Sequence, residues 1–202
     1  MKKIVITGGL GYIGTELCKL YSGEARYNKI TVIDNQFYSD RVKQLRDWGI
    51  NFIQADILDE VKMSAILKDA DVVFHLAGVT DVAYTKTQEN DAKDSKIRRV
   101  GIYGTANIIK YTPSHVKIIF PSTHVVFEGL SETKENLTEE DNAKPALTYA
   151  MGKLESETDL QLSGKNFVIL RLASVYGYSG DSTRMNIMPN LFSKIASQNG
   201  TI

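Results

Sequence analysis

Tyr149 and Lys153 form the side-chain pair of this sequence best suited to proton transfer. They stand four positions apart, so on a helix they project from one face, one turn apart. A phenol with the ordinary pKa of about 10 is a poor base at neutral pH, but a neighbouring ammonium stabilises the phenolate and lowers that pKa. The pair therefore predicts a general acid–base for the hydroxyl of a sugar or an alcohol. The same spacing is also common on amphipathic helices, where it forms only a surface pair.

Three glycines near the N-terminus form a second candidate site. The apolar run 3–7 ends in a turn in which Gly8, Gly11 and Gly14 recur every third position, and a helical pattern follows at once. The backbone N–H groups of such a turn approach a diphosphate closely, and the positive end of the helix dipole points at it. A strand before the turn and a helix after it are the context of a dinucleotide site. The alternative is a tight turn that binds no ligand.

Asp34 ends the second predicted strand, 20 positions after Gly14. In dinucleotide-binding folds a carboxylate at this place accepts hydrogen bonds from the hydroxyls of the adenosine ribose, and it would repel a 2′-phosphate. The nearest arginine downstream is Arg41, so the sequence contains no obvious clamp for such a phosphate. This combination favours NAD over NADP. The alternative is a solvated aspartate with no ligand.

The elements that would position these residues alternate along the chain. Apolar, β-branched runs predict strands, and the segments between them have apolar residues at helical spacing. The runs are nearly continuous, which is typical of parallel strands covered on both faces. The alternation predicts a doubly wound α/β fold, a Rossmann-type parallel sheet whose carboxyl edge binds ligands and carries Thr123 after the fifth strand. The predicted strands are residues 3–7, 29–34, 51–54, 71–76, 116–120 and 167–172.

Two segments interrupt this alternation. Residues 128–144 are rich in Glu, Asn, Thr and Gly and have no periodicity, so they predict an acidic surface loop that leads into a helix beginning near Pro145. Residues 175–202 contain one short amphipathic piece, 188–196, and no complete α/β unit. We therefore expect an NAD-binding domain over residues 1–174, followed by a separate segment, 175–202, with no obvious partner.

The composition is that of a globular protein with a sizeable core. Apolar residues make up 43% of the 202 positions, and 24 basic residues balance 24 acidic ones, so no global field attracts nucleic acid or an anionic membrane. No run approaches the roughly 18 apolar residues of a membrane span, and the first apolar stretch is too short for a secretory signal. Cys18 is the single cysteine, which excludes an intramolecular disulfide and a cysteine-based metal cluster and favours a cytoplasmic location.

Several motifs, in this order, resemble those of the extended short-chain dehydrogenase/reductases, in particular the NAD-dependent nucleotide-sugar epimerases and dehydratases. The resemblance extends from residue 1 to about residue 196. It rests on the glycine turn 7–14, the Asp56–Ile57 pair that contacts adenine in the family, the stretch 75–78 beneath the cofactor, Gly104 to Asn107 of a long central helix, the Tyr149–Lys153 pair, and Arg171 with the signature 175–177.

The resemblance implies a mechanism, a cofactor and partners. Tyr149 would move the hydroxyl proton while a hydride passes between a substrate carbon and the nicotinamide. Lys153 would hold the nicotinamide ribose, and Thr123 would hydrogen-bond the reacting oxygen. The substrate would be a nucleotide sugar, and two copies would form a homodimer through helices 94–111 and 145–163. The residues implied for NAD are Gly8, Gly11, Tyr12, Ile13, Gly14, Asp34, Asn35, Asp56, Ile57, Leu76, Ala77, Gly78, Tyr149 and Lys153.

Some positions depart from the family pattern. The dehydratases have an acidic pair directly after Thr123, where this chain has His124 and Val125, so epimerisation is expected rather than dehydration. Gly101 stands where the family commonly has asparagine, and it shares a predicted helix face with Gly104, which suggests close backbone packing there. Family members usually continue further than this chain, so the resemblance implies that residues 175–202 are the beginning of a truncated substrate-binding lobe. An NAD(P)-dependent reductase and a non-catalytic NAD-binding module remain alternatives, and the sequence does not specify the sugar.

Overall fold

Six parallel strands form the centre of the molecule. The computed structural model describes residues 1–80, 91–180, 184–185 and 187–198. The strand order in the sheet is β3-β2-β1-β4-β5-β6, so the chain first moves outward from β1 and then crosses back to continue on the other side. The predicted doubly wound parallel sheet is confirmed. The strands are β1 (Lys3–Thr7), β2 (Lys29–Asp34), β3 (Asn51–Gln54), β4 (Val72–His75), β5 (Lys117–Thr123) and β6 (Asn166–Leu172).

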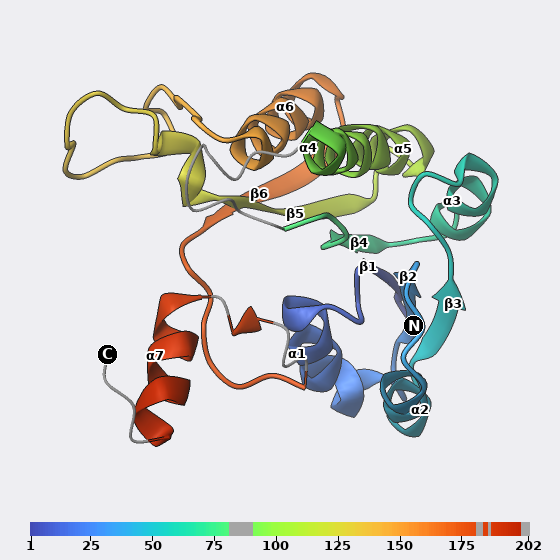
Figure 1. Ribbon diagram of the computed structural model, residues 1–202. Helices are drawn as coiled ribbons and strands as arrows, with labels where there is room; N and C mark the ends of the chain where they lie inside the picture. The colour runs from blue at the N-terminus through green and yellow to red at the C-terminus, as the bar shows by residue number, and fades with distance from the viewer. Residues whose placement is uncertain (81–90, 181–183, 186, 199–202) are drawn as a thin grey trace.

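Helices cover both faces of the sheet (Figure 1). Alternate residues of a strand point to opposite faces, so Ile4 and Ile6 of β1 pack in one core cluster while Val5 packs in the other. The first cluster includes Cys18 of α1, and the second includes Leu160 of α6. On one face lie α1 (Tyr12–Tyr21) and α2 (Ser39–Asp47); on the other lie α3 (Glu60–Leu67), α4 (Asp91–Arg98), α5 (Gly104–Tyr111) and α6 (Thr148–Leu162).

Both edge strands differ from the prediction that every strand is covered on both faces. Three of the four residues of β3 are exposed, and the other edge strand, β6, is also incompletely covered. Its residues alternate between exposed and half-buried, and Val168 and Leu170 are 37% and 42% exposed. The first three predicted strands have the observed bounds, and the other three differ by one to three residues at an end. An apolar run therefore located β6 correctly, but it did not indicate whether a neighbouring layer covers the strand.

Two helices also differ from the sequence predictions. The helix expected near Pro145 begins at Thr148, because hydrogen bonds from Lys144 to Val126 and from Gly129 to Lys144 hold the preceding chain in the loop. The whole of α2 was missed, since this segment is strongly polar and buries only Val42 and Leu45. The acidic segment 128–144 contains no helix or strand, as predicted.

The long central helix is interrupted by a π-helical turn, Arg99–Tyr103, between α4 and α5. Close packing is confirmed at Gly104, where a Cβ would lie 2.3 Å from Cδ1 of Ile57. It is wrong for Gly101, where a Cβ would have no neighbour within 4 Å. The Gly101 carbonyl instead accepts hydrogen bonds from the hydroxyls of Thr105 and Ser156. A π turn adds one residue to the helical repeat, so the two glycines no longer share a face.

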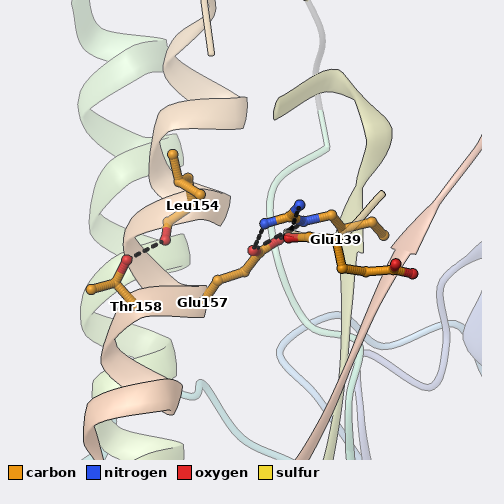
Figure 2. A network of polar contacts seen from close by, with 5 residues as sticks. Glu139, Leu154, Glu157 and Thr158 are labelled. Atoms are coloured by element: carbon orange, nitrogen blue, oxygen red, sulfur yellow. Dashed lines mark hydrogen bonds and ion pairs between the residues drawn. The ribbon is translucent and has the colours of Figure 1, made fainter. Parts of the chain in front are cut away.

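A buried ion pair joins α6 to the edge strand (Figure 2). Glu157 of α6 is 2% exposed, and its carboxylate accepts hydrogen bonds from Nε and Nη2 of Arg171 in β6, the latter at 2.7 Å. Nη1 of the same guanidinium donates to the carbonyl of Glu139 at 3.3 Å. Arg171 thus fixes the acidic loop against α6, and pairing with Glu157 raises the pKa of Arg171.

The C-terminal segment lies beside α1 (Figure 1). The predicted amphipathic piece is the helix α7 (Met188–Ser197), in which no residue is buried. Asn190 of α7 donates to the hydroxyl of Tyr12 at 3.3 Å. Residues 181–183, 186 and 199–202 lie outside the described part of the chain, and the division at residue 174 stays a prediction. Among the described residues, no helix is long and apolar enough to span a membrane.

Candidate active site

One cavity of about 1420 Å³ lies at the carboxyl edge of the sheet. The strand order reverses between β1 and β4, and ligands of open α/β sheets bind in the crevice at such a point. The cavity brings together every residue singled out for catalysis or cofactor binding: Gly8, Gly11, Tyr12, Ile13, Gly14, Asp34, Asn35, Asp56, Ile57, Leu76, Ala77, Gly78, Thr123, Tyr149 and Lys153 all line it.

The glycine turn leaves room only for backbone. Gly8 has φ +69°, and a Cβ there would lie 2.7 Å from the Cα of Ala77. A Cβ on Gly14 would lie 2.3 Å from the carbonyl oxygen of Gly8. Gly11 caps α1 without any side-chain hydrogen bond, so no side chain occupies the N–H groups at the start of this helix. The turn therefore fits the diphosphate of a dinucleotide, which such N–H groups and the helix dipole bind.

Asp34 is held at the end of β2 by backbone donors. Its two carboxylate oxygens accept hydrogen bonds from the N–H groups of Leu10 at 3.1 Å and Gln36 at 3.0 Å. Burial raises the pKa of Asp34, and these hydrogen bonds and the charge of Arg41 act in the opposite direction. Next to it, the amide of Asn35 donates to the carboxylate of Asp56 at 3.2 Å. This end of the cavity presents oxygen acceptors, as binding of ribose hydroxyls requires.

Arg41 is the nearest arginine downstream of Asp34 in the sequence, where it was not expected to form a phosphate clamp, and the structure brings it to this end of the cavity. Its Nη1 donates to the carbonyl of Leu10, and its guanidinium lies 4.7 Å from the ring centroid of Tyr38. A 3.4 Å hydrogen bond from Nη2 reaches the carbonyl of Gly180. Arg41 therefore supports the turn and the C-terminal segment at the same time.

Tyr149 and Lys153 lie one turn apart on α6, as predicted. The Lys153 ammonium donates to the carbonyl of Pro121 at 2.8 Å and lies 4.4 Å from the ring centroid of Phe120. Burial lowers the pKa of Lys153 to about 8, although the charge of Glu157 acts in the opposite direction. Burial also raises the pKa of Tyr149. The expectation that Lys153 lowers the pKa of Tyr149 is therefore wrong for this structure, because the effect of burial on the phenol is larger.

Thr123 and Ser122 place two hydroxyls at the end of β5. The Thr123 oxygen accepts a hydrogen bond from the N–H of Val125 at 3.2 Å, which leaves its O–H able to donate into the cavity. The Ser122 hydroxyl is buried and has no hydrogen-bond partner, and sequence reasoning did not single it out. His124 is bound to the carbonyl of Leu172 at 3.1 Å.

A buried polar chain connects the glycine turn with the helix that carries Tyr149. The Thr7 hydroxyl lies 2.8 Å from Nδ1 of His75, and Nε2 of the same ring lies 3.0 Å from the hydroxyl of Thr105. Thr105 donates onward to the carbonyl of Gly101, which also accepts from Ser156 of α6. Burial lowers the pKa of His75 to about 3, with the charge of Lys153 acting in the same direction. His75 is therefore a neutral structural residue.

Sequence reasoning missed three charged residues that line the cavity, Lys96, Glu128 and Arg184. Arg184 is the one of these that acts on Tyr149. It lines the wall near Tyr149, and its charge lowers the tyrosine pKa, opposing the effect of burial. Its Nη1 donates to Oγ1 of Thr80 at 2.7 Å and to the carbonyl of the same residue at 3.3 Å. No spacing rule connects position 184 with position 149, because the contact arises only when the C-terminal segment returns to the sheet edge.

The sequence matches the NAD dependent epimerase/dehydratase family over residues 4–202. The chain belongs to this family. Among curated relatives of the family, the UDP-glucose 4-epimerase of Mycoplasma genitalium is 28% identical over 206 residues, which covers 94% of this chain and 58% of that protein. The UDP-N-acetyl-alpha-D-glucosaminuronate decarboxylase of Bacillus cytotoxicus is 30% identical over 188 residues, which covers 87% of this chain and 55% of that protein.

The fold of the family is also found in solved structures. The UDP-glucuronic acid 4-epimerase from Bacillus cereus, in complex with UDP-glucuronic acid and NAD, superimposes with a TM-score of 0.80 at 25% identity, covering 98% of this chain and 64% of that one. Members of this NAD dependent epimerase/dehydratase family thus include epimerases and a decarboxylase. The chain spans little more than half the length of the two curated relatives.

Proposed function

We propose that this chain binds NAD and acts as a nucleotide-sugar epimerase. The observation that carries the proposal is that the glycine turn, Asp34 and the three catalytic candidates line one cavity at the sheet edge. The turn accommodates a diphosphate because only glycine fits at Gly8 and Gly14. The names of the epimerase relatives support the sugar-nucleotide part of the proposal.

Each residue of the catalytic group has a distinct role in this proposal. NAD supplies a reversible acceptor for a hydride from the substrate carbon. Tyr149 exchanges a proton with the sugar hydroxyl, and Thr123 donates a hydrogen bond to the same oxygen. Lys153 holds the nicotinamide ribose, and its attachment to the Pro121 carbonyl fixes the ammonium at the end of β5. His124 and Val125 provide no acidic pair after Thr123, which supports epimerisation over dehydration.

The substitution Tyr149→Phe tests the catalytic part. Loss of a general acid–base reduces turnover by roughly 10²- to 10⁴-fold, whereas the affinity for NAD should change little. The assay interconverts UDP-glucose and UDP-galactose with NAD present, and absorbance at 340 nm reveals any net reduction of the cofactor. Tyr178→Phe is the matched control, since Tyr178 is 91% exposed.

Three results would contradict the proposal. Unchanged turnover of Tyr149→Phe would remove the tyrosine from the mechanism. Accumulation of NADH in proportion to substrate would indicate a reductase instead. Wild-type protein that fails to bind NAD by calorimetry would refute the cofactor part altogether.

We further propose that the protein is a cytoplasmic homodimer. Tyr103, in the π turn between α4 and α5, and Met151 of α6 are 65% and 48% exposed, and they lie on the helices through which the family resemblance implies dimerisation. Light scattering of the purified protein measures this directly, and a monomeric mass at micromolar concentration would contradict the dimer.

A further inference from the structure

The wall of the cavity beside Tyr149 contains a buried hydrogen-bond donor that is not used. Nε of Arg184 is buried and has no hydrogen-bond partner among the residues that the structure describes, while both hydrogen bonds of its guanidinium to Thr80 use Nη1. A buried N–H without an acceptor costs free energy, so an arginine in this state is suited to receive an acceptor from a ligand.

Arg184 is held in place from two sides. The loop after β4 fixes its Nη1 through Thr80, and the side chain of Asn190 in α7 donates to its backbone carbonyl at 3.2 Å. The Thr80 acceptors are a hydroxyl and a carbonyl, both uncharged, so these partners do not compensate the positive charge of the guanidinium. An anchored guanidinium that keeps its charge is a typical carboxylate or phosphate binder.

The cavity is lined by charged residues of both signs. Asp34 and Asp56 lie at the end formed by β2 and β3, whereas Lys153 and Arg184 lie toward Tyr149. Lys96 and Glu128 also line the wall. Burial lowers the pKa of Lys153 to about 8, and its ammonium is bound to the Pro121 carbonyl. Arg184 is therefore the better placed cation for an anionic group beside the phenol, and its charge already acts on Tyr149.

We propose that Arg184 binds a carboxylate on the sugar, next to the hydroxyl that exchanges its proton with Tyr149, so that the preferred substrate is a nucleotide uronate. This inference rests on the proposed function of the same cavity. In a hexuronate the carboxylate is attached beside the 4-hydroxyl carbon, whereas the diphosphate is attached across the ring. The cofactor diphosphate belongs to the glycine turn, at the start of α1.

The experiment compares two ligands that differ only at this group. Calorimetry on the full chain, saturated with NAD, measures the dissociation constants of UDP-glucuronate and UDP-glucose. Wild-type protein should prefer UDP-glucuronate, and Arg184→Met should weaken it by roughly 10- to 100-fold, because hydrogen bonds to charged groups contribute about 1.5–3 kcal/mol. The dissociation constant of UDP-glucose for Arg184→Met should stay within about twofold of the wild-type value. Arg184→Lys should retain part of the preference, because the charge remains while the fork of donors is lost.

Arg46→Met is the matched control, because Arg46 is exposed on α2 and does not line the cavity. Equal affinities of the wild type for the two sugars would overturn the proposal, as would binding of neither sugar by protein that binds NAD. An equal loss of affinity for both nucleotide sugars in Arg184→Met would assign the arginine to the substrate diphosphate instead. A loss of NAD affinity in this variant would assign it to the cofactor. Failure of the wild type to bind NAD is a separate result and concerns the proposed function.

Discussion

At the scale of single residues, burial is the main influence on the pKa values of Tyr149 and Lys153. The charge of Lys153 was expected to lower the pKa of Tyr149, but the ammonium is bound to the Pro121 carbonyl and burial raises the tyrosine pKa. The same burial lowers the pKa of Lys153 itself. The positive charge that opposes burial at the phenol comes from Arg184. The cation that acts on the phenol therefore comes from the C-terminal segment and not from α6.

The low pKa of Lys153 predicts a pH-dependent stability. The folded pKa is about 8 and the ordinary value is 10.5, so between these values the unfolded chain binds a proton that the folded chain does not. The free energy of unfolding therefore rises with pH across this window. Relative to Lys153→Met, wild-type stability should increase by on the order of 3 kcal/mol from pH 8 to pH 10.5.

Urea unfolding of the ligand-free protein at several pH values measures this difference. Lys43→Met, at an exposed position on α2, serves as the control. The difference in the free energy of unfolding between wild type and Lys43→Met should not change with pH across this window. A wild-type curve parallel to that of Lys153→Met across the window would show that the lysine keeps its ordinary pKa.

The identity of the site residues could be predicted from local patterns, whereas their environment could not. The turn 8–14, Asp34 and the Tyr149–Lys153 pair each follow a spacing that is contained in one element or one βα unit. Arg184 and Arg41 reach the site through long-range contacts to Thr80 and to Leu10. Burial of the catalytic pair also depends on side chains that no local pattern specifies.

At the scale of elements, the π turn between α4 and α5 decides how the central helix packs. It separates the roles of two glycines that the sequence places on one helical face: Gly104 contacts Ile57, and Gly101 exposes its carbonyl to Thr105 and Ser156. The π turn could not be predicted, because those carbonyl contacts involve α6, about 50 residues later in the chain. The helix α2 was missed for a different reason: it is polar and buries only two residues, so too few apolar residues recur in its sequence to indicate a helix.

Alanine at the two glycines should have opposite effects. Gly104→Ala places a methyl group 2.3 Å from Cδ1 of Ile57, and such overpacking typically costs about 1–3 kcal/mol. Gly101→Ala meets no neighbour within 4 Å and should stabilise by up to about 1 kcal/mol, because alanine has the higher helix propensity. Chemical denaturation measures both free energies of unfolding.

The double variant Gly104→Ala with Ile57→Val removes Cδ1 and should recover part of the loss. Equal effects of alanine at the two positions would contradict the packing described for the π turn.

At the scale of the whole molecule, the cavity joins two halves of the sheet. Gly8 and Asp34 belong to the half built by β1, β2 and β3, whereas Thr123 and Tyr149 belong to the half built by β4, β5 and β6. The α/β alternation was sufficient to predict this topology. It did not predict the exposed face of β6, because coverage of a strand depends on surfaces that its own sequence does not describe.

A ligand that contacts both halves should stabilise the fold as a unit. At a concentration 100 times its dissociation constant, NAD should add about 2.7 kcal/mol, which corresponds to a rise in Tm of roughly 5–10 °C for a chain of this size. NADP should give a smaller rise, because Asp34 repels a 2′-phosphate. Differential scanning fluorimetry measures both.

Gly14→Ala should abolish this rise, since its methyl group would lie 2.3 Å from the Gly8 carbonyl oxygen. Gly23→Ala is the matched control, because a Cβ there has no neighbour within 4 Å. A larger shift with NADP than with NAD would overturn the role assigned to Asp34.

The polar chain through His75 also determines where the ring carries its proton. The Thr105 hydroxyl donates its hydrogen to the Gly101 carbonyl. It can therefore only accept a hydrogen bond from the His75 ring, so Nε2 of His75 carries the N–H. Thr7, which accepts from the Ala77 N–H, then donates to the bare Nδ1. All four hydrogen bonds run in one direction and fix a single tautomer. Any proton that the protein takes up near neutrality therefore binds at a position other than His75.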